Sequence, residues 1–269
     1  MISRKELQEY AKTVGLNLGQ AEKDYFQNIL LFLIYRNYGK DIVFKGGTAL
    51  KKCYGIARFS EDLDFTCLSE MKIEKIEDGL RRFNLEFETE TKKYPVGLKV
   101  TFRIKGPLYN GIRFSLCKLI MDFSFRENVI LNPNIKTIGR FLEEIPTFDV
   151  FVMQEPEILA EKVRAILTRT TARDVYDIWF LLNNGVKFDQ NLVKKKLEYY
   201  NQKWNPREFS RKLGMKSSIW KTELESLIPN VPDFREARKL ILENVPGKPA
   251  RSKNKSPDQP HQQALHLKS

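Results

Sequence analysis

The pattern of hydrophobic and polar positions divides the chain into a mixed first half and a helical second half. Residues 3–14 and 20–38 are predicted to form helices, because apolar residues recur along them at helical spacing. A short apolar strand at 42–44 ends at a glycine pair, and a helix over 48–54 can open directly from that pair. A strand at 63–67 and a helix at 71–84 are predicted to follow.

A strand-rich stretch comes after residue 84. Apolar side chains alternate there with polar ones between residues 98 and 104, which is the pattern of a half-buried strand. Turn-forming residues at 106–111 then lead into a second long strand that runs through Phe125. We therefore expect a β-hairpin in this region.

After Pro146 the pattern becomes helical. Beyond Pro246 the sequence is rich in Gly, Pro, Lys, Ser and Gln without periodicity, so a disordered tail is expected. The expected domains are an α/β domain over 1–150, a helical domain over 151–246 and a basic tail over 247–269. The helices predicted in the second domain span 155–168, 172–183, 189–202, 205–213, 217–226 and 233–244.

The composition is that of an ordinary globular protein, with 42% hydrophobic and 30% charged residues in 269 positions. The longest apolar run, 29–35, is too short to span a bilayer, so no membrane partner is expected. The N-terminus lacks the apolar stretch of a signal peptide. Cys53, Cys67 and Cys117 form no CxxC pair, which indicates reduced thiols in a cytoplasmic protein.

The formal net charge of +12 favours a polyanionic partner such as nucleic acid, although the surplus could serve solubility alone. Both histidines, His261 and His266, lie in the tail, so neither a histidine base nor a histidine zinc ligand is expected in the body of the protein. The GxxxxGK[ST], GxGxxG and GxSxG motifs are missing from the sequence. Any chemistry must therefore come from carboxylates, lysines and bound metal.

Two aspartates and a glycine pair form the first candidate site. Asp62 and Asp64 are two apart on a predicted strand, so both project from one face and could share Mg²⁺. Taken alone, such a pair is more often a hydrated strand end. Gly46, Gly47 and Thr48 lie between a strand and a helix, where glycine lets phosphate approach the backbone. A phosphate site and a metal pair within 20 residues are more specific together than either alone.

A third carboxylate, Asp122, lies on the strand predicted over 118–125. If this strand runs beside the one that carries Asp62 and Asp64, three carboxylates converge. Two of them could then hold metal while the third deprotonates an attacking hydroxyl. The alternative is that Asp122 is a surface residue on a hydrated face.

Two residues of the helical half are further candidates. Lys162 falls inside the apolar arc of its helix, with Glu157, Glu161 and Arg164 on the opposite side. Its ammonium either extends to solvent or points into a cleft at a bound anion. Asp177 lies on a helix that is apolar on nearly every side, so it needs a partner. That partner is either a structural one, Arg173 or a nearby lysine, or Lys162 at a nucleotide site.

These residues resemble the AbiEii/AbiGii toxin family of nucleotidyltransferases. The resemblance runs from the first helices through about residue 183, and residues 184–269 carry no recognisable family signature. Thr48 stands where the family often has serine, and the hydroxyl is retained. The resemblance is carried by five ordered blocks, at 21–25, 44–55, 58–65, 157–162 and 173–177.

The resemblance implies an α+β fold, a polymerase-β-like nucleotidyltransferase mixed sheet with flanking helices and a helical C-terminal part that contributes to the active site. It implies a toxin of a toxin–antitoxin or phage-defence pair that transfers a nucleotide from an NTP to the 3′ end of tRNA, with two Mg²⁺ ions and a cognate antitoxin. Asp62 and Asp64 would be metal ligands, Asp122 the third carboxylate, and Lys162 and Asp177 the later catalytic pair. The triphosphate would be held by Gly46, Gly47, Thr48 and Ser60, with Lys52 and Arg58 nearby.

Two alternatives remain open. The same fold could transfer a nucleotide to a protein side chain or to a small molecule. The chain could also be a regulator that binds nucleotide or nucleic acid without turnover, although the intact carboxylate set argues against that.

Overall fold

The computed structural model describes residues 2–139 and 145–245 of the chain, and its strands form one mixed sheet. In chain order the strands are β1 (Ile42–Lys45), β2 (Leu63–Cys67), β3 (Phe87–Tyr94), β4 (Gly97–Ile104), β5 (Cys117–Ser124), β6 (Asn134–Ile138) and β7 (Phe148–Val152). Across the sheet their order is β3-β4-β5-β2-β1-β7-β6. The β1–β7 and β2–β5 pairs are parallel, and the other neighbours are antiparallel.

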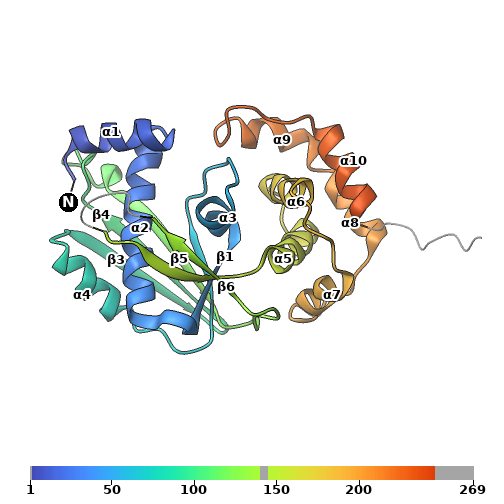
Figure 1. Ribbon diagram of the computed structural model, residues 1–269, viewed down its shortest axis with the longest axis horizontal. Coiled ribbons are helices and arrows are strands. Elements are labelled where there is room, and N and C mark those ends of the chain that lie inside the picture. The colour runs from blue at the N-terminus through green and yellow to red at the C-terminus, as the bar shows by residue number, and fades with distance from the viewer. Residues whose placement is uncertain (1, 140–144, 246–269) are drawn as a thin grey trace, which may run out of the picture.

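The helices form an N-terminal and a C-terminal group along the chain, labelled in Figure 1. The N-terminal group is α1 (Arg4–Val14), α2 (Leu18–Tyr38), α3 (Gly46–Tyr54) and α4 (Glu74–Arg82), with short 3₁₀ turns at Gly39–Asp41 and Arg113–Ser115. The C-terminal group is α5 (Glu155–Thr168), α6 (Arg173–Asn183), α7 (Gln190–Glu198), α8 (Pro206–Gly214), α9 (Ser217–Leu224) and α10 (Phe234–Asn244).

Local sequence explains where the first helices begin. Ser3 and Glu6 form a reciprocal capping box at α1, and Asn17 and Gln20 form another at α2. Gly15 ends α1 with a φ of 66°, a left-handed conformation that glycine adopts without a steric cost. Helix α2 is buried on most of its surface because it packs against the apolar face of the sheet. The opposite face of the sheet carries polar side chains together with the buried Val43.

Two hydrophobic clusters follow the two halves of the chain. The first joins α1, α2 and α4 to the apolar sides of the strands. The second joins α5 to α10 and also takes in Val43, Leu50 and Ile56 from the β1–α3 region. Helix α3 therefore packs on both clusters, which positions its N-terminus between the halves. The expected domain boundary near residue 150 stays a prediction.

The expected elements are present, with differences in extent. The predicted hairpin is confirmed as the β4–β5 pair, but its second strand begins at Cys117, so the connection is longer than the predicted turn at 106–111. Helix α3 begins at Gly46, two residues earlier than expected, while α4 and α7 are shorter than predicted. Strands β3, β6 and β7 were not individually predicted; β3 is polar and mostly exposed, so it lacks a clear apolar alternation. The predicted disordered tail lies outside the described residues.

Candidate active site

The turn between β1 and α3 brings a helix N-terminus and a carboxylate together. Within the described chain, no side chain caps the first turn of α3. The unpaired N–H groups of such a helix end, together with the helix dipole, favour an anion. Gly46 has a φ of 76°, and a Cβ at this position would overlap the carboxylate of Asp64. Glycine is therefore needed both for the backbone conformation and for the approach of Asp64.

The loop before β2 is held tightly against this helix end. The hydroxyl of Thr48 donates a hydrogen bond to the backbone carbonyl of Asp62. A Cβ at Gly47 would lie 2.8 Å from Oγ of Ser60 and would overlap the guanidinium of Arg58. From α2, Nε2 of Gln27 donates to the carbonyls of Ser60, at 3.0 Å, and of the next residue, at 2.8 Å. The loop and the helix N-terminus thus form one unit.

Two of the three predicted carboxylates, Asp64 and Asp122, lie on neighbouring positions of the sheet. The β2–β5 register pairs Asp64 with Asp122, which confirms the expectation that the two strands run side by side. On the other side, Asp64 pairs with Lys45 at the end of β1. Asp62 lies just before β2 and is exposed. The register therefore aligns Lys45, Asp64 and Asp122 on one face of the sheet.

Burial and mutual repulsion act on the protonation of these acids. The pKa of Asp64 is raised to about 6, mainly by burial; the Lys162 ammonium opposes this rise, and the Asp62 and Asp122 carboxylates add to it. The pKa of Asp62 is also raised, by partial burial and by the charge of Glu61. Crowded carboxylates with raised pKa values have a strong electrostatic reason to bind a cation.

The arrangement of the acidic side chains in the described residues bears on whether they form a metal centre. In residues 2–139 and 145–245, no group of three or more acidic, cysteine or histidine side chains is arranged to hold a metal ion. The assignment of Asp62, Asp64 and Asp122 as metal ligands therefore stays a prediction. It rests on the register of Asp64 with Asp122 and on the charge balance described above.

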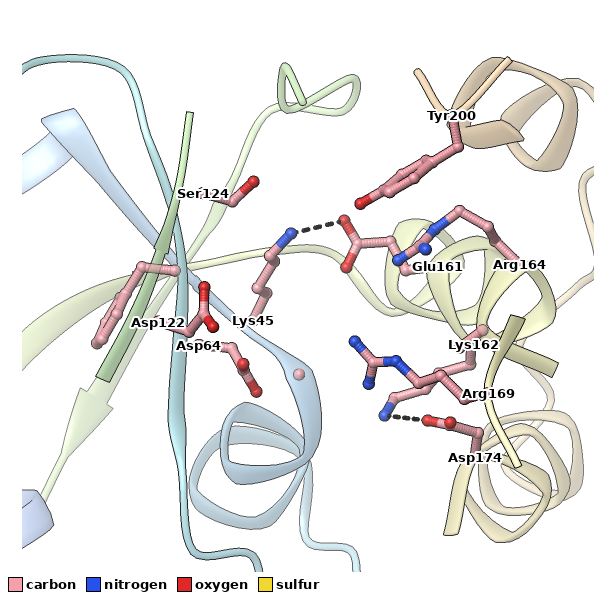
Figure 2. Close-up of a pocket in the computed structure, with 13 residues that line it drawn as sticks. Lys45, Asp64, Asp122, Ser124, Glu161, Lys162, Arg164, Arg169, Asp174 and Tyr200 are labelled. Atoms are coloured by element: carbon pink, nitrogen blue, oxygen red, sulfur yellow. Dashed lines mark hydrogen bonds and ion pairs between the residues drawn. The ribbon is translucent and has the colours of Figure 1, made fainter. Parts of the chain in front are cut away.

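A cavity of about 160 Å³ lies between the sheet and the helical half. Asp64, Asp122 and Lys45 line it from the strands, and they face Lys162 of α5 and Arg169, the residue that follows α5 (Figure 2). The cavity is rich in charge of both signs. Its position between the two halves makes both groups of elements necessary for a complete site.

Lys162 points into this cavity and does not extend to bulk solvent. Its Nζ lies 2.8 Å from Oδ1 of Asp174 and 2.7 Å from Oδ2 of Asp177. Asp177 is fully buried and also accepts from Nη2 of Arg58 at 2.7 Å. The predicted proximity of Lys162 and Asp177 is thus confirmed, whereas their role at a nucleotide site stays a prediction. Arg173, the structural alternative, is not among the partners of Asp177 in the described chain.

The two predicted basic residues of the phosphate region differ in position. Arg58 is 3% exposed and joins α3 to α6, since it contacts Gly47 and forms a bidentate pair with Asp177. Lys52 is not among the residues that line the cavity. Its ammonium is held by Asp24 at 2.7 Å and by the side-chain oxygen of Asn28 at 2.6 Å. The predicted place of Lys52 near the phosphates stays a prediction, and in this structure its ammonium is held by side chains of α2.

Sequence reasoning missed a second buried charge network behind the cavity. Lys196 on α7 is fully buried and lies 2.8 to 3.1 Å from carboxylate oxygens of Glu127, Glu157 and Glu161. Glu161 also pairs with Lys45 at 3.1 Å, so the network reaches the strand beside Asp64. The face of α5 that we expected to be polar is therefore buried too.

Little in the sequence could have revealed this network. Lys45 directly precedes the glycine pair and lies inside a recognised block, so it was the accessible clue. Glu127 lies in the loop after β5, and Lys196 lies in a stretch of three lysines, where only its helical spacing from Leu192 and Val193 distinguishes it from its exposed neighbours. Arg164 lies over the Tyr200 ring, 4.0 Å from its centroid, and both line the cavity.

Similar solved structures show the fold to which the protein belongs. A candidate nucleotidyltransferase from H. pylori has a TM-score of 0.56 at 19% identity, covering 81% of this chain and 89% of that one. MenT4, the nucleotidyltransferase toxin Rv2826c of Mycobacterium tuberculosis H37Rv, has a TM-score of 0.57 at 18% identity, covering 92% and 89%. The predicted fold, a polymerase-β-like nucleotidyltransferase mixed sheet with flanking helices, is thereby confirmed.

The sequence then gives the particular family. The model of the nucleotidyl transferase AbiEii toxin family, of the Type IV TA system, matches residues 30–243. The chain belongs to this family and is a nucleotidyltransferase, as the sequence motifs predicted. The uncharacterized protein aq_aa25 of Aquifex aeolicus (strain VF5) is 29% identical over 164 residues, 58% of this chain and 66% of that protein. The chain thus spans about two thirds of the length of this curated relative.

Two further features bear on the setting of the protein. Among the helices that the structure describes, none has both the length and the apolar character that a membrane span requires. Cys53, Cys67 and Cys117 are all free thiols, as their spacing predicted.

Proposed function

We propose that this chain is the toxin of a type IV toxin–antitoxin or phage-defence (abortive infection) system that transfers a nucleoside monophosphate from an NTP to RNA. The proposed acceptor is the 3′ end of tRNA, the reaction depends on Mg²⁺, and a cognate antitoxin restrains it. The reduced cysteines and the NTP requirement favour a cytoplasmic setting. Family membership supports the toxin and the nucleotidyl transfer; the acceptor, the metal and the antitoxin belong to the proposal.

The observation that carries the proposal is the position of Asp64. It pairs in register with Asp122 on one side and with Lys45 on the other, and it touches the N-terminal turn of α3 at Gly46. Carboxylates for catalysis, a cation for phosphate charge and a helix end for phosphate oxygens therefore meet at one residue.

The proposed reaction is an in-line displacement at phosphorus. The 3′-hydroxyl oxygen of the acceptor attacks the α-phosphorus of the NTP and forms a new P–O bond. The bond from the α-phosphorus to the oxygen that bridges the α- and β-phosphates breaks, and pyrophosphate leaves. Asp122, whose side chain is 46% exposed, takes the hydroxyl proton and passes it to water.

The residues present suit a divalent metal. Asp62, Asp64 and Asp122 offer only hard carboxylate oxygens, which Mg²⁺ prefers. When bound, two Mg²⁺ ions would neutralise triphosphate charge and polarise the attacking hydroxyl. Asp62 and Asp64 would hold the metal, with Asp122 as third ligand or as base.

The remaining predicted residues bind and orient the nucleotide in this scheme. The α3 N-terminus at Gly46 and Gly47 and the hydroxyl of Ser60 would contact phosphate oxygens. Thr48 contributes by holding the Asp62 carbonyl, and Arg58 contributes through its contact with Gly47.

From the helical half, Lys162 would place its charge against the triphosphate. Asp177 keeps this lysine in position from behind, and burial by itself would lower the pKa of Lys162, but the Asp174 and Asp177 carboxylates raise it above its ordinary value. Lys162 is therefore a cation when the nucleotide binds.

The decisive experiment labels the acceptor. Purified protein is incubated with Mg²⁺, total tRNA and each of the four α-³²P nucleoside triphosphates in turn, with Asp62→Ala as the matched inactive variant. We expect label on tRNA with one nucleotide and at least a 10²-fold loss in Asp62→Ala, because the metal site loses a ligand.

Other outcomes would contradict specific parts of the proposal. Label on a protein or on a small molecule would replace RNA as the acceptor. If Asp62→Ala labelled the acceptor as well as the wild type does, the proposed role of the carboxylates in catalysis would be wrong. Nucleotide binding without label on any acceptor would favour a regulator without turnover. Omission of Mg²⁺ by chelation is expected to abolish labelling, and persistence of the label would overturn the metal requirement.

A further inference from the structure

One row of side chains crosses five strands of the sheet. The backbone register pairs Lys45 with Asp64, Asp64 with Asp122, Asp122 with Lys99, and Lys99 with Lys92. Directly paired residues on adjacent strands project from the same face, so these side chains form one line from β1 to β3. With adjacent strands about 4.8 Å apart, the line is roughly 19 Å long.

The row has an inner part and an outer part. Lys45, Asp64 and Asp122 line the cavity (Figure 2), whereas Lys99 and Lys92 lie outside it. Nζ of Lys99 is 3.9 Å from Oδ2 of Asp122, and its side chain is 40% exposed. Lys92 is exposed as well. The row therefore leads from the candidate catalytic carboxylates out onto an accessible face of β3 and β4.

This outer face carries surplus positive charge. Its acids are already paired: Glu88 with Arg113 at 2.8 Å, and Glu90 with Arg103 at 3.2 Å. Within residues 2–139 and 145–245, no carboxylate pairs with Lys92. The unpaired lysine charge suits a polyanion, and the net charge of +12 for the chain agrees with that.

An exposed aromatic ring accompanies the lysines. Tyr94 follows Lys92 by two positions on β3, so it projects from the same face, and it is 44% exposed. The Lys92 ammonium lies 5.4 Å from the centroid of its ring. An aromatic face beside a row of cations is the arrangement that binds unpaired nucleotides, because the ring stacks a base while the lysines contact phosphates.

We propose that the outer face of β3 and β4 binds the unpaired 3′-terminal segment of the RNA acceptor. Lys99 and Lys92 contact successive phosphates, and Tyr94 stacks a base. The register that aligns Lys92 with Asp122 delivers the terminal hydroxyl to the carboxylates. This inference rests on the proposed function, since it names the acceptor surface of the same site. An acidic protein segment would use the lysines but would have no need for a stacking ring.

Lys92→Ala tests the phosphate contact, and Lys93→Ala is the matched control. Lys93 is its neighbour on β3 and is also exposed, but it pairs with Leu98 and projects from the opposite face. The probe is a fluorescein-labelled RNA stem with a short unpaired 3′ end, and binding is followed by anisotropy without NTP at several salt concentrations. We expect Lys92→Ala to weaken binding several-fold and to reduce the slope of log K against log salt by about 1, with Lys93→Ala unchanged.

Tyr94→Ala tests the stacking contact. Loss of a stacked base weakens binding by roughly 5- to 100-fold, and it leaves the salt slope unchanged because no charge is removed. The effect is expected only for RNA with an unpaired 3′ end and not for the same stem with a blunt end. In turnover assays, both Lys92→Ala and Tyr94→Ala raise KM for RNA and leave KM for NTP unchanged, which a general loss of folding would not do.

The outcomes separate this inference from the proposed function. If wild-type protein binds and labels RNA but Lys92→Ala and Tyr94→Ala match Lys93→Ala, the surface is wrong and the function stands. If wild-type protein labels a protein and binds no RNA, RNA is not the acceptor, and the inferred RNA-binding surface is wrong as well. Equal thermal stability of the three variants excludes unfolding as the cause of any difference.

Discussion

At the residue scale, Gly46 and Gly55 show how the two ends of one short helix differ. Both have positive φ, 76° and 81°, which favours glycine. A Cβ at Gly46 would overlap the Asp64 carboxylate, whereas a Cβ at Gly55 would meet nothing within 4 Å. A side chain would therefore strain the backbone at both positions. Of the two glycines, only Gly46 contacts the candidate site.

Replacing each glycine by alanine separates these two effects. Both Gly46→Ala and Gly55→Ala are expected to lose on the order of 1 kcal/mol of unfolding free energy through backbone strain. Only Gly46→Ala is expected to lose nucleotide transfer, by about 10²-fold or more, because Asp64 must move. Urea unfolding and the labelling assay measure the two quantities. Equal activity of the two variants would show that the approach of Asp64 to Gly46 is unimportant.

The aspartates illustrate what could be predicted at this scale. The spacing of Asp62 and Asp64 and the position of Gly46 follow from local sequence alone. Asp122 could be predicted as the third carboxylate only on a condition. Its strand had to lie beside the strand that carries Asp64. The partners of Lys52 could not be predicted for a similar reason: Asp24 and Asn28, which hold its ammonium, come from α2.

At the element scale, buried ion pairs join α5 and α6. Lys162 on α5 contacts Asp174 and Asp177, which are three apart on α6 and so lie on neighbouring positions of its surface. Asp174 also accepts a hydrogen bond from the Thr171 hydroxyl at 3.0 Å. Apolar periodicity predicted both helices, but it did not predict that they pack against each other. The buried ion pairs connect the two helices at these positions.

The acid stability of the protein should report this contact. Burial by itself would raise the pKa of Asp174, but the Lys162 ammonium lowers it from 3.8 to about 2. A folded-state pKa below the unfolded value stabilises the protein above the unfolded pKa, and this contribution is lost as the pH falls through the folded pKa. Asp174→Asn lacks it at every pH.

We therefore expect the wild type to exceed Asp174→Asn in unfolding free energy by on the order of 2 kcal/mol at pH 6, with the gap narrowing by about 1 kcal/mol at pH 3. Urea titrations at a series of pH values measure the gap. Glu225→Gln is the surface control, since Glu225 forms an exposed pair with Lys221 and should change stability by less than about 0.5 kcal/mol. A gap that does not depend on pH would contradict the assignment.

At the scale of the whole molecule, charged networks connect the sheet to the helical half. Lys196 on α7 reaches Glu161 on α5, and Glu161 reaches Lys45 on β1. Burial opposes the charge on Lys196, but the Glu161, Glu127 and Glu157 carboxylates raise its pKa above the ordinary value. The cavity thus lies between two halves held together by buried charge as well as by apolar contact.

Loss of the Lys196 ammonium should destabilise the whole molecule. Lys196→Met leaves three neighbouring glutamates without their shared cation, and breaking a buried pair costs about 3–5 kcal/mol. Lys195→Met is the matched control, because Lys195 is the preceding residue on α7 and is exposed. Urea unfolding should show the loss in Lys196→Met and almost none in Lys195→Met. Similar values for the two would mean that the network contributes little.

The sequence by itself determined the helices, the glycine turn, the carboxylate pair and the family, because each depends on residues close together along the chain. Apolar periodicity and short motifs contain that information directly. Polar strands such as β3 could not be predicted in this way. Their residues form a strand because they pair with a neighbouring strand, and not because they alternate between apolar and polar.

Only the tertiary structure decided which charges face one another. It aligned Lys45, Asp64, Asp122, Lys99 and Lys92 in one row, and it placed Lys162 across the cavity. The physical reason is that strand register and helix packing are set by burial of apolar surface over the whole fold. Charged side chains are then carried to positions that no local pattern specifies.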